Sequence, residues 1–253
     1  MIVSHAHRLI FVHLRKCAGS SVTVSLARML GPDDIMIGSY GDARAHGIDP
    51  PRRMLREAWA HPHLSAALKH LPRGRRWRFA SSSVKRHYAK TLGPAPDHAT
   101  AARIALAFPD EWRDYRSFAV IRDPWTRTVS EYHWRTRGME APPPFRAFLE
   151  ALAAGDDLDG LVHPLHFSLP ALSVDGEVAV TRLVRFERLA DDLRDTMDAF
   201  GIEWDGWLPK AKQRKKGPRA VDLYGPEEMR LIERAYGEEI AAFGHTPPAG
   251  FPA

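Results

Sequence analysis

A group of small, hydroxyl-bearing and basic residues follows the first apolar segment of the chain. Residues 8–14 (RLIFVHL) have the composition of a buried strand, and residues 22–30 are predicted to form a helix that stops at Gly31-Pro32. The turn between them contains Lys16, Gly19, Ser20 and Ser21. A turn that enters a helix offers unpaired backbone N–H groups and the positive end of the helix dipole, and both attract phosphate-like anions. The turn therefore predicts an anion site.

Other readings of the same turn stay open at this point. It is not the nucleotide-binding pattern G-x-x-x-x-G-K-[ST], because Lys16 precedes Gly19. A plain strand–turn–helix with a solvated lysine also fits the segment on its own. The thiol of Cys17 either has a lowered pKa beside Lys16 at the helix start or is simply a small residue. A cysteine phosphatase is excluded, since C-x₅-R would need an arginine where Thr23 stands.

A second candidate site begins with Arg122, at the end of the apolar run 117–121 (SFAVI). Ligands of open α/β sheets bind at the carboxyl ends of strands. Asp123-Pro124 follows, and a helix is predicted from Trp125 to about Arg137. Ser130 lies about two turns into that helix, so it could reach the same anion as Arg122. The alternative is a structural pair of Arg122 with Asp123 and a solvent-facing Ser130.

Strands and helices alternate along the chain. A third strand is predicted over residues 181–186 (TRLVRF), and helices are predicted over 52–70, 97–108, 145–154, 187–200 and 226–243. Asp97 is the expected N-cap of the helix 97–108. This alternation predicts an α/β fold with a mainly parallel central sheet flanked by helices. With 253 residues, 44% of them hydrophobic, a single domain over residues 1–253 is expected, with its core at about 8–245.

The basic residues are unevenly distributed. The chain has 36 Lys+Arg and 31 Asp+Glu, a net charge of +5, but residues 69–90 and 210–219 contain fourteen of the positive charges and no acid. The remainder therefore carries a net charge of −9. This distribution predicts an anionic partner. The single cysteine, the absence of an apolar run of about 20 residues and the histidines that interrupt the N-terminal segment predict a cytoplasmic protein without a membrane span.

Taken together, the two candidate sites resemble those of the sulfotransferases that use 3′-phosphoadenosine 5′-phosphosulfate (PAPS), especially the carbohydrate-type family 2. Residues 10–21 resemble the family's pattern H-x-P-K-T-A-G-[ST]-[ST], and residues 118–132 resemble F-x-x-[VI]-R-[ND]-P-[WFY]-x-R-x-x-S-x-Y. Shorter likenesses lie at 97–101 (DHATA), 184–189 (VRFERL) and 243–245 (FGH). In this sequence Arg15 replaces the family's proline and Cys17 its threonine. The resemblance implies the sulfotransferase form of the P-loop NTPase-like architecture.

The resemblance also implies roles for particular residues. Lys16 would stabilise charge on the departing 3′,5′-diphosphoadenosine, and Arg122 and Ser130 would bind the 3′-phosphate of the donor. The 5′-phosphosulfate would lie on the loop formed by Arg15, Cys17, Ala18, Gly19, Ser20 and Ser21. A late basic loop, Arg214, Lys215, Lys216 and Gly217, would close over the 3′-phosphate or, alternatively, is a solvated surface. The transfer implies no metal, and the pairs His61/His63 and His163/His166 are interpreted as loop histidines.

The acceptor hydroxyl needs a general base. His98 is favoured because imidazole titrates near the working pH and the family-like segment places it near the site, and His46 is the rival. The expected acceptor is a small molecule or saccharide. Two alternatives remain: a nucleotide- or polyanion-binding protein of the same fold without turnover, and, less favoured, a nucleic-acid-binding protein. The basic patch Arg73–Lys90 fits an anionic acceptor or nucleic acid.

Overall fold

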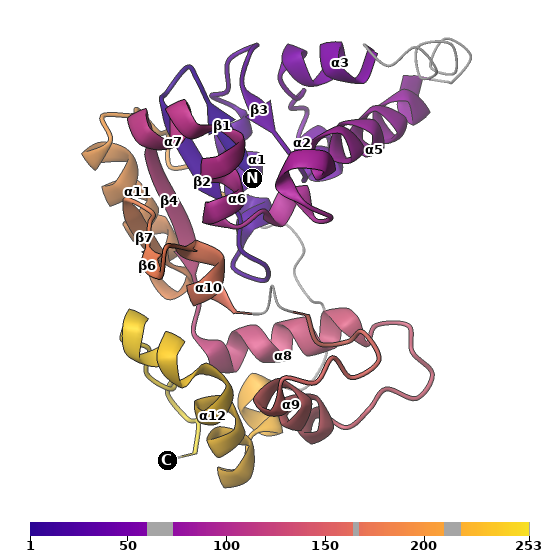
Figure 1. The fold of residues 1–253 in the computed structure, drawn as a ribbon, viewed down its shortest axis with the longest axis vertical. Coiled ribbons are helices and arrows are strands. Elements are labelled where there is room, and N and C mark those ends of the chain that lie inside the picture. Colours follow the sequence, from indigo (N-terminus) through magenta and orange to yellow (C-terminus); the bar gives the residue numbers. More distant parts are fainter. Residues whose placement is uncertain (60–72, 164–166, 210–218, 253) are drawn as a thin grey trace.

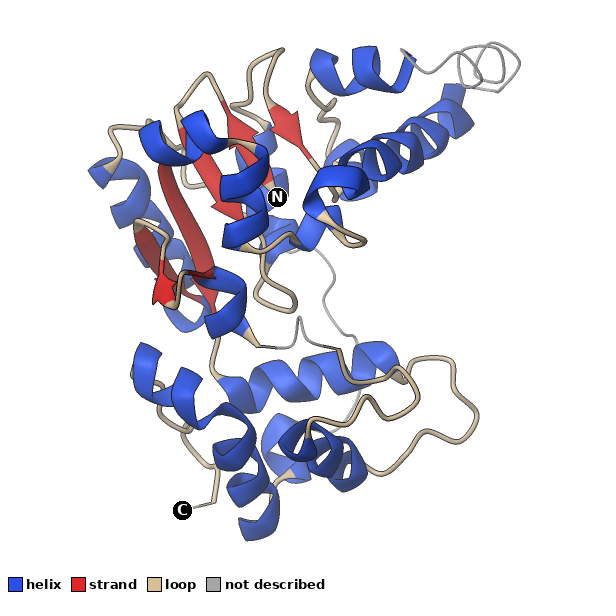
Figure 2. Cartoon of the chain, in the orientation of Figure 1, coloured by secondary structure: helices blue, strands red, loops and turns tan. Residues whose placement is uncertain are grey.

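A five-stranded sheet forms the centre of the protein. The computed structural model describes residues 1–59, 73–163, 167–209 and 219–252. The strand order is β3 (Ile35–Met36), β1 (Ile2–Ser4), β2 (Leu9–Val12), β4 (Arg116–Ile121) and β7 (Arg182–Arg185). β2 pairs with β4 and β4 with β7 in parallel, whereas β1 is antiparallel to both of its neighbours. Four of the five strands therefore run the same way, which confirms the predicted α/β fold with a mainly parallel sheet (Figure 2).

The three strands predicted from the apolar runs are β2, β4 and β7. β2 and β4 are fully buried except at Arg116, because these runs lie at the centre of the sheet with helices on both sides. β1 and β3 were not predicted. They are only three and two residues long, too short to give a periodic signal in the sequence.

Helices cover the sheet and enclose the larger apolar core. They are α1 (Gly19–Ala27), α2 (Tyr40–Ala45), α3 (Arg52–Trp59), α5 (Arg73–Leu92), α6 (Ala101–Ala107), α7 (Pro109–Asp114), α10 (Ser168–Leu172) and α11 (Leu189–Ala199). Two short 3₁₀ turns, η1 (Pro96–His98) and η3 (Phe186–Arg188), lie next to the candidate site, and a small hairpin joins β5 (Ser173–Val174) to β6 (Glu177–Val178). α5, which includes most of the first basic segment, extends away from the sheet (Figure 1).

A second apolar cluster lies beyond the carboxyl ends of β2 and β4. It is formed by α8 (Pro124–Arg135), α9 (Phe145–Ala154), η4 (Ala220–Leu223) and α12 (Pro226–Phe243), which we call the helical lobe. Trp125, Phe148 and Ile232 are at most 1% exposed in its centre. Figure 1 shows these helices together below the sheet, with β4 leading directly into α8. α9 and α12 have the predicted bounds.

The predicted cap of the helix 97–108 is wrong. Asp97 lies in η1, and the helix α6 begins after it, with the Thr100 hydroxyl accepting a hydrogen bond from the Arg103 N–H. Asp97 accepts from Lys85 Nζ at 2.6 Å instead, because α5 packs beside η1. The predicted helix 52–70 corresponds to α3 as far as Trp59, and its remaining residues lie outside the described part.

Candidate active site

The loop between β2 and α1 has an unusual backbone. Lys16 and Ala18 both have left-handed conformations, with φ of 59° and 54°. Non-glycine residues adopt this conformation at a cost and often at functional sites. A turn that alternates the handedness of its residues also points successive N–H groups into one concavity, which favours an anion. The loop geometry therefore agrees with the predicted anion site.

Gly19 is required by a close contact with His13. A Cβ at position 19 would lie 1.8 Å from Cδ2 of the His13 ring, so no side chain fits there. α1 begins at this glycine, and the first helical hydrogen bond of the turn runs from Val22 N to Ala18 O. The N–H groups of Gly19, Ser20 and Ser21 precede that bond, and the first turn contains no acid. This end of α1 is therefore suited to a phosphate group.

Arg122 reaches the same loop from the end of β4. Its Nη1 donates to the backbone oxygen of Lys16 at 3.1 Å, and its Nε donates to the Thr126 hydroxyl at 2.9 Å. The guanidinium is half-buried, and burial lowers its pKa. Within the described residues no carboxylate oxygen lies within 4.0 Å of it, although Asp123 and Glu187 are close enough to oppose this shift. A guanidinium in this position is suited to bind an anion such as a phosphate group.

The third parallel strand contributes the surface beneath Arg122. The Phe186 ring, directly after β7, lies 4.1 Å from the Arg122 Cζ, and Glu187 Oε1 accepts the Asp123 N–H at 3.0 Å. Asp123 in turn caps α8 by accepting from Thr126 N at 2.7 Å. The segment 184–189 (VRFERL), one of the shorter likenesses to the family, thus supports the start of α8. The carboxyl ends of β2, β4 and β7 lie at the same edge of the sheet.

Ser130 lies on α8, four residues after Thr126, and is half-buried. Residues four apart face the same side of a helix, so Ser130 continues the face of α8 from which Thr126 contacts Arg122. The structure therefore brings together the loop that carries Lys16, Arg122 and the face of α8 that carries Ser130.

A family model described as the sulfotransferase family matches residues 1–151, which include both motifs. The chain belongs to the sulfotransferase family. The match confirms the resemblance seen in the sequence. The chain is also similar to the crystal structure of a sulfotransferase from Alicyclobacillus acidocaldarius, with 16% identity, a TM-score of 0.44, and coverage of 95% of this chain and 96% of that chain. No curated protein matches it.

In this chain, His98 packs directly against the loop between β2 and α1. Its Nδ1 lies 2.9 Å from the backbone oxygen of His13, and the two imidazole rings meet edge to face at 4.5 Å. A carbonyl oxygen only accepts, so Nδ1 donates the hydrogen and Nε2 carries the lone pair. Burial lowers the pKa of His98 to about 4, against the opposing charge of Asp97. The expectation that His98 titrates near the working pH is therefore wrong, and it is neutral there.

The structure places His46 elsewhere. It is exposed at the end of α2, and its ring packs edge to face on Trp207 at 5.3 Å. The backbone oxygen of Trp207 accepts from the Ser25 hydroxyl, six residues beyond the start of α1. Six helical residues span about 9 Å, so His46 lies near the far end of α1 from the loop. Of the two candidate bases, only His98 contacts the loop.

The Cys17 thiol belongs to the apolar core. It is 1% exposed, its Sγ donates to the Arg15 backbone oxygen at 3.2 Å, and burial raises its pKa to about 11. The alternative of an activated thiolate is therefore excluded by the surroundings of the side chain. With its thiol buried, Cys17 could contact a bound donor only through its backbone groups.

The Arg15 guanidinium pairs with Glu131 of α8. Its Nη2 and Nε lie 2.7 and 3.2 Å from Glu131 Oε1, and the Trp134 ring lies 5.0 Å from its Cζ. Glu131 was inside the motif quoted from the sequence, but nothing there indicated this partner, which lies 116 residues earlier. A small open pocket adjoins the pair and is lined by Arg15, Lys16, Arg127, Thr128, Glu131 and Tyr236.

Arg214, Lys215, Lys216 and Gly217 lie outside the described residues. The side chains of the Arg73–Lys90 patch are described only from Ser81 onwards, where Lys85 pairs with Asp97. Within the described chain, no three His, Cys, Asp or Glu side chains are grouped as metal ligands. Among the same residues, no helix combines the length and apolar character needed to span a membrane.

Proposed function

We propose that this member of the family transfers a sulfuryl group from PAPS to a hydroxyl group of a carbohydrate or carbohydrate-containing acceptor. The observation that supports it most is the half-buried Arg122, which has no carboxylate within 4.0 Å among the described residues and donates to the loop oxygen of Lys16. An anion at Arg122 and an anion at the start of α1 would thus lie on either side of one peptide segment. PAPS carries phosphate groups at both ends of its ribose.

The donor would be held by the residues that the fold brings together. The N–H groups of Gly19, Ser20 and Ser21 would bind the 5′-phosphosulfate at the start of α1. Arg122 and Ser130 would bind the 3′-phosphate, because Arg122 Nη2 takes part in no hydrogen bond with the described residues. Arg214, Lys215, Lys216 and Gly217 remain candidates for covering that phosphate.

Sulfuryl transfer resembles phosphoryl transfer, in which positioning and charge stabilisation supply most of the catalysis. The acceptor oxygen forms a bond to sulfur as the bond between sulfur and the bridging oxygen of the 5′-phosphate breaks. Lys16 would stabilise the negative charge that develops on that bridging oxygen. His98 would accept the acceptor's proton at Nε2, which is 4.0 Å from Asp97 Oδ2, so that the carboxylate would stabilise the imidazolium formed.

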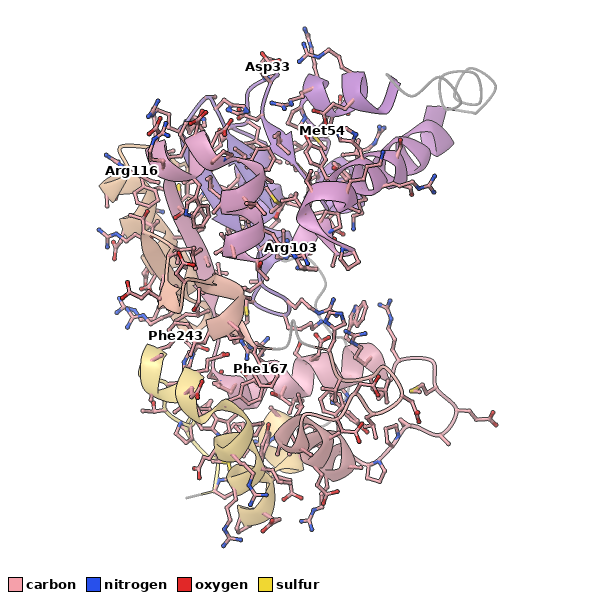
Figure 3. All side chains as sticks on the ribbon, viewed as in Figure 1. Asp33, Met54, Arg103, Arg116, Phe167 and Phe243 are labelled. Atoms are coloured by element: carbon pink, nitrogen blue, oxygen red, sulfur yellow. The ribbon has the colours of Figure 1, made fainter. Side chains whose placement is uncertain are left out.

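Binding of 3′,5′-diphosphoadenosine tests the donor site. We expect saturable binding by titration calorimetry, weakened about 100-fold in Arg122→Ala, because hydrogen bonds to charged groups contribute about 1.5–3 kcal/mol each. Arg116→Ala is the matched control. Arg116 lies at the other end of β4, at the edge of the molecule (Figure 3), where it contacts the Ala199 oxygen. Equal affinity in both variants would contradict the assignment.

The same titration separates the alternatives. A polyanion- or nucleic-acid-binding protein would bind diphosphoadenosine weakly and heparin or single-stranded DNA with a steep salt dependence. A binding protein without turnover would bind diphosphoadenosine tightly but transfer no label from ³⁵S-PAPS to any acceptor. Transfer to glycosides or polysaccharides, and not to phenols or to water alone, supports the proposed acceptor class.

The pH dependence of transfer tests His98 as the base. Because burial lowers its pKa to about 4, His98 stays neutral down to about pH 5, and kcat/KM should be flat between pH 8 and 5.5 and fall as pH approaches 4. An ordinary histidine with a pKa of about 6.5 would be about nine-tenths protonated at pH 5.5. His98→Ala should lose most of kcat, whereas the control His46→Ala should keep it. An acid limb near pH 6.5 would identify a different base.

A further inference from the structure

We propose that Glu131 is a positioning residue that fixes the loop carrying Lys16, through its ion pair with Arg15. This pair would replace the proline that the family pattern has at position 15. The effect of this ion pair on catalysis rests on the proposed function. Its effect on the conformation of the loop does not. We call the Arg15–Glu131 ion pair the brace.

The pair is well suited to hold the loop. Two nitrogens of Arg15 converge on Glu131 Oε1, at 2.7 and 3.2 Å, and the two side chains are only 14% and 4% exposed. Arg135 Nε donates to the same oxygen at 3.0 Å from the next turn of α8, which fixes the carboxylate on its helix. A buried, charge-assisted contact of this kind is stronger than a surface ion pair.

The loop needs such a brace because its conformation is costly. Lys16 and Ala18 are left-handed without being glycine. A proline at position 15 would restrict its own φ and the backbone conformation of Leu14. It would therefore reduce the number of conformations that the loop can adopt. Arginine imposes no such restriction. Within the described residues, no backbone hydrogen bond uses the Arg15 N–H, so a proline there would remove none.

The brace also connects the loop to the rest of the site. Arg122 and the buried Cys17 hold residues 16 and 17 against the sheet, whereas Arg15 reaches across to the helical lobe. Glu131 is the neighbour of Ser130 on α8. The Arg15–Glu131 pair thus fixes the distance between the loop and the helix that carries the predicted 3′-phosphate contact.

Cys17 provides a direct measurement of loop opening. It is the only cysteine of the chain, it lies in this loop, and it is 1% exposed, so a reagent such as iodoacetamide reaches it only when the loop opens. We expect Glu131→Gln to raise the labelling rate about tenfold, the factor that corresponds to 1.4 kcal/mol of loop opening. Glu228→Gln is the matched control, because Glu228 holds Arg146 at 2.7 Å in the same lobe, away from the loop. Its labelling rate should equal that of the unmodified protein.

The proline variant makes the test specific for the brace. In an Arg15→Pro background, Glu131→Gln should leave labelling unchanged, because no pair remains to be broken. An equal acceleration in both backgrounds, or none in either, would overturn the proposal. If Glu131→Gln unfolds at the assay temperature, Arg15→Gln breaks the same pair from the loop side and must raise labelling by a similar factor; normal labelling would again overturn it.

Sulfate transfer adds the catalytic part. Glu131→Gln should lower kcat about tenfold in the Arg15 background and not in the Arg15→Pro background. The affinity for diphosphoadenosine should change by less than about threefold, because the contacts of Arg122 with Lys16 and Thr126 do not involve the Arg15–Glu131 pair. Faster labelling in a protein that neither binds diphosphoadenosine nor transfers sulfate would refute the proposed function and leave the brace intact. Normal labelling in an active enzyme would do the reverse.

Discussion

Lys16→Ala should lower kcat for sulfate transfer by about 10²–10³-fold, the usual loss when one preorganised group that stabilises transition-state charge is removed. This expectation rests on the position of Lys16 in the loop, where its backbone is held by Arg122. Arg122 holds its carbonyl oxygen at 3.1 Å, and the left-handed φ of 59° sets the direction in which its side chain leaves the loop. A charge placed in advance needs no reorganisation as the reaction proceeds.

The measurement is transfer from ³⁵S-PAPS to an acceptor identified in the screen, together with diphosphoadenosine affinity by calorimetry. The affinity should fall much less than kcat, because the phosphate contacts of Arg122 and the α1 N–H groups remain. Arg234→Ala, which removes an exposed basic residue of α12, is the control and should leave both quantities unchanged. Equal turnover in Lys16→Ala and the unmodified protein would remove Lys16 from the mechanism.

The sequence was sufficient to predict the edge of the sheet at which the candidate site lies. β2 and β4 are continuous apolar runs, and each is followed by polar or basic residues, with Lys16, Ser20 and Ser21 after β2 and Arg122 directly after β4. Parallel strands end at the same edge, so two such endings predict one site. The fold class followed from the same alternation, and the structure confirms it.

Other features depend on contacts that no local pattern contains. Asp97 has the side chain of a helix cap, but α5 provides Lys85 as a partner, and the cap passes to Thr100. The pKa values of His98 and Cys17 depend on burial under elements far away in the sequence, and burial moves them to about 4 and about 11. The ion pair of Arg15 with Glu131 joins residues 116 positions apart. Residue types were enough to predict which side chains are candidates for the site. Packing determines the partners and the pKa values of those side chains, and the sequence does not show it.

Glu239→Gln should destabilise the protein by about 3–5 kcal/mol, because it leaves a buried charge without its partner. Arg127 Nη1 lies 2.8 Å from Glu239 Oε1, and both side chains are at most 4% exposed. Burial disfavours the charge on Arg127, but Glu239 outweighs it and raises the pKa of the guanidinium. In Glu239→Gln this partner is lost, yet the guanidinium keeps its proton because the ordinary pKa of arginine lies far above neutral pH. Glu239 Oε2 also accepts the N–H groups of Ser168 and Leu169, at 2.6 and 3.2 Å. The substitution thus loosens α8, α10 and α12 together.

The free energy of unfolding, measured with urea, tests this expectation. Glu238→Gln is the matched control, since it makes the same change one residue earlier on the exposed side of α12 and should leave stability unchanged. The double variant Arg127→Met/Glu239→Gln should be less destabilised than Glu239→Gln alone, because the unpaired buried charge is removed while the glutamine oxygen still accepts from Ser168. If the loss of unfolding free energy in the double variant instead equals the sum of the losses in Arg127→Met and Glu239→Gln, Arg127 and Glu239 contribute independently. In that case the two side chains would stabilise the contact of α8 with α12 separately and not as an ion pair.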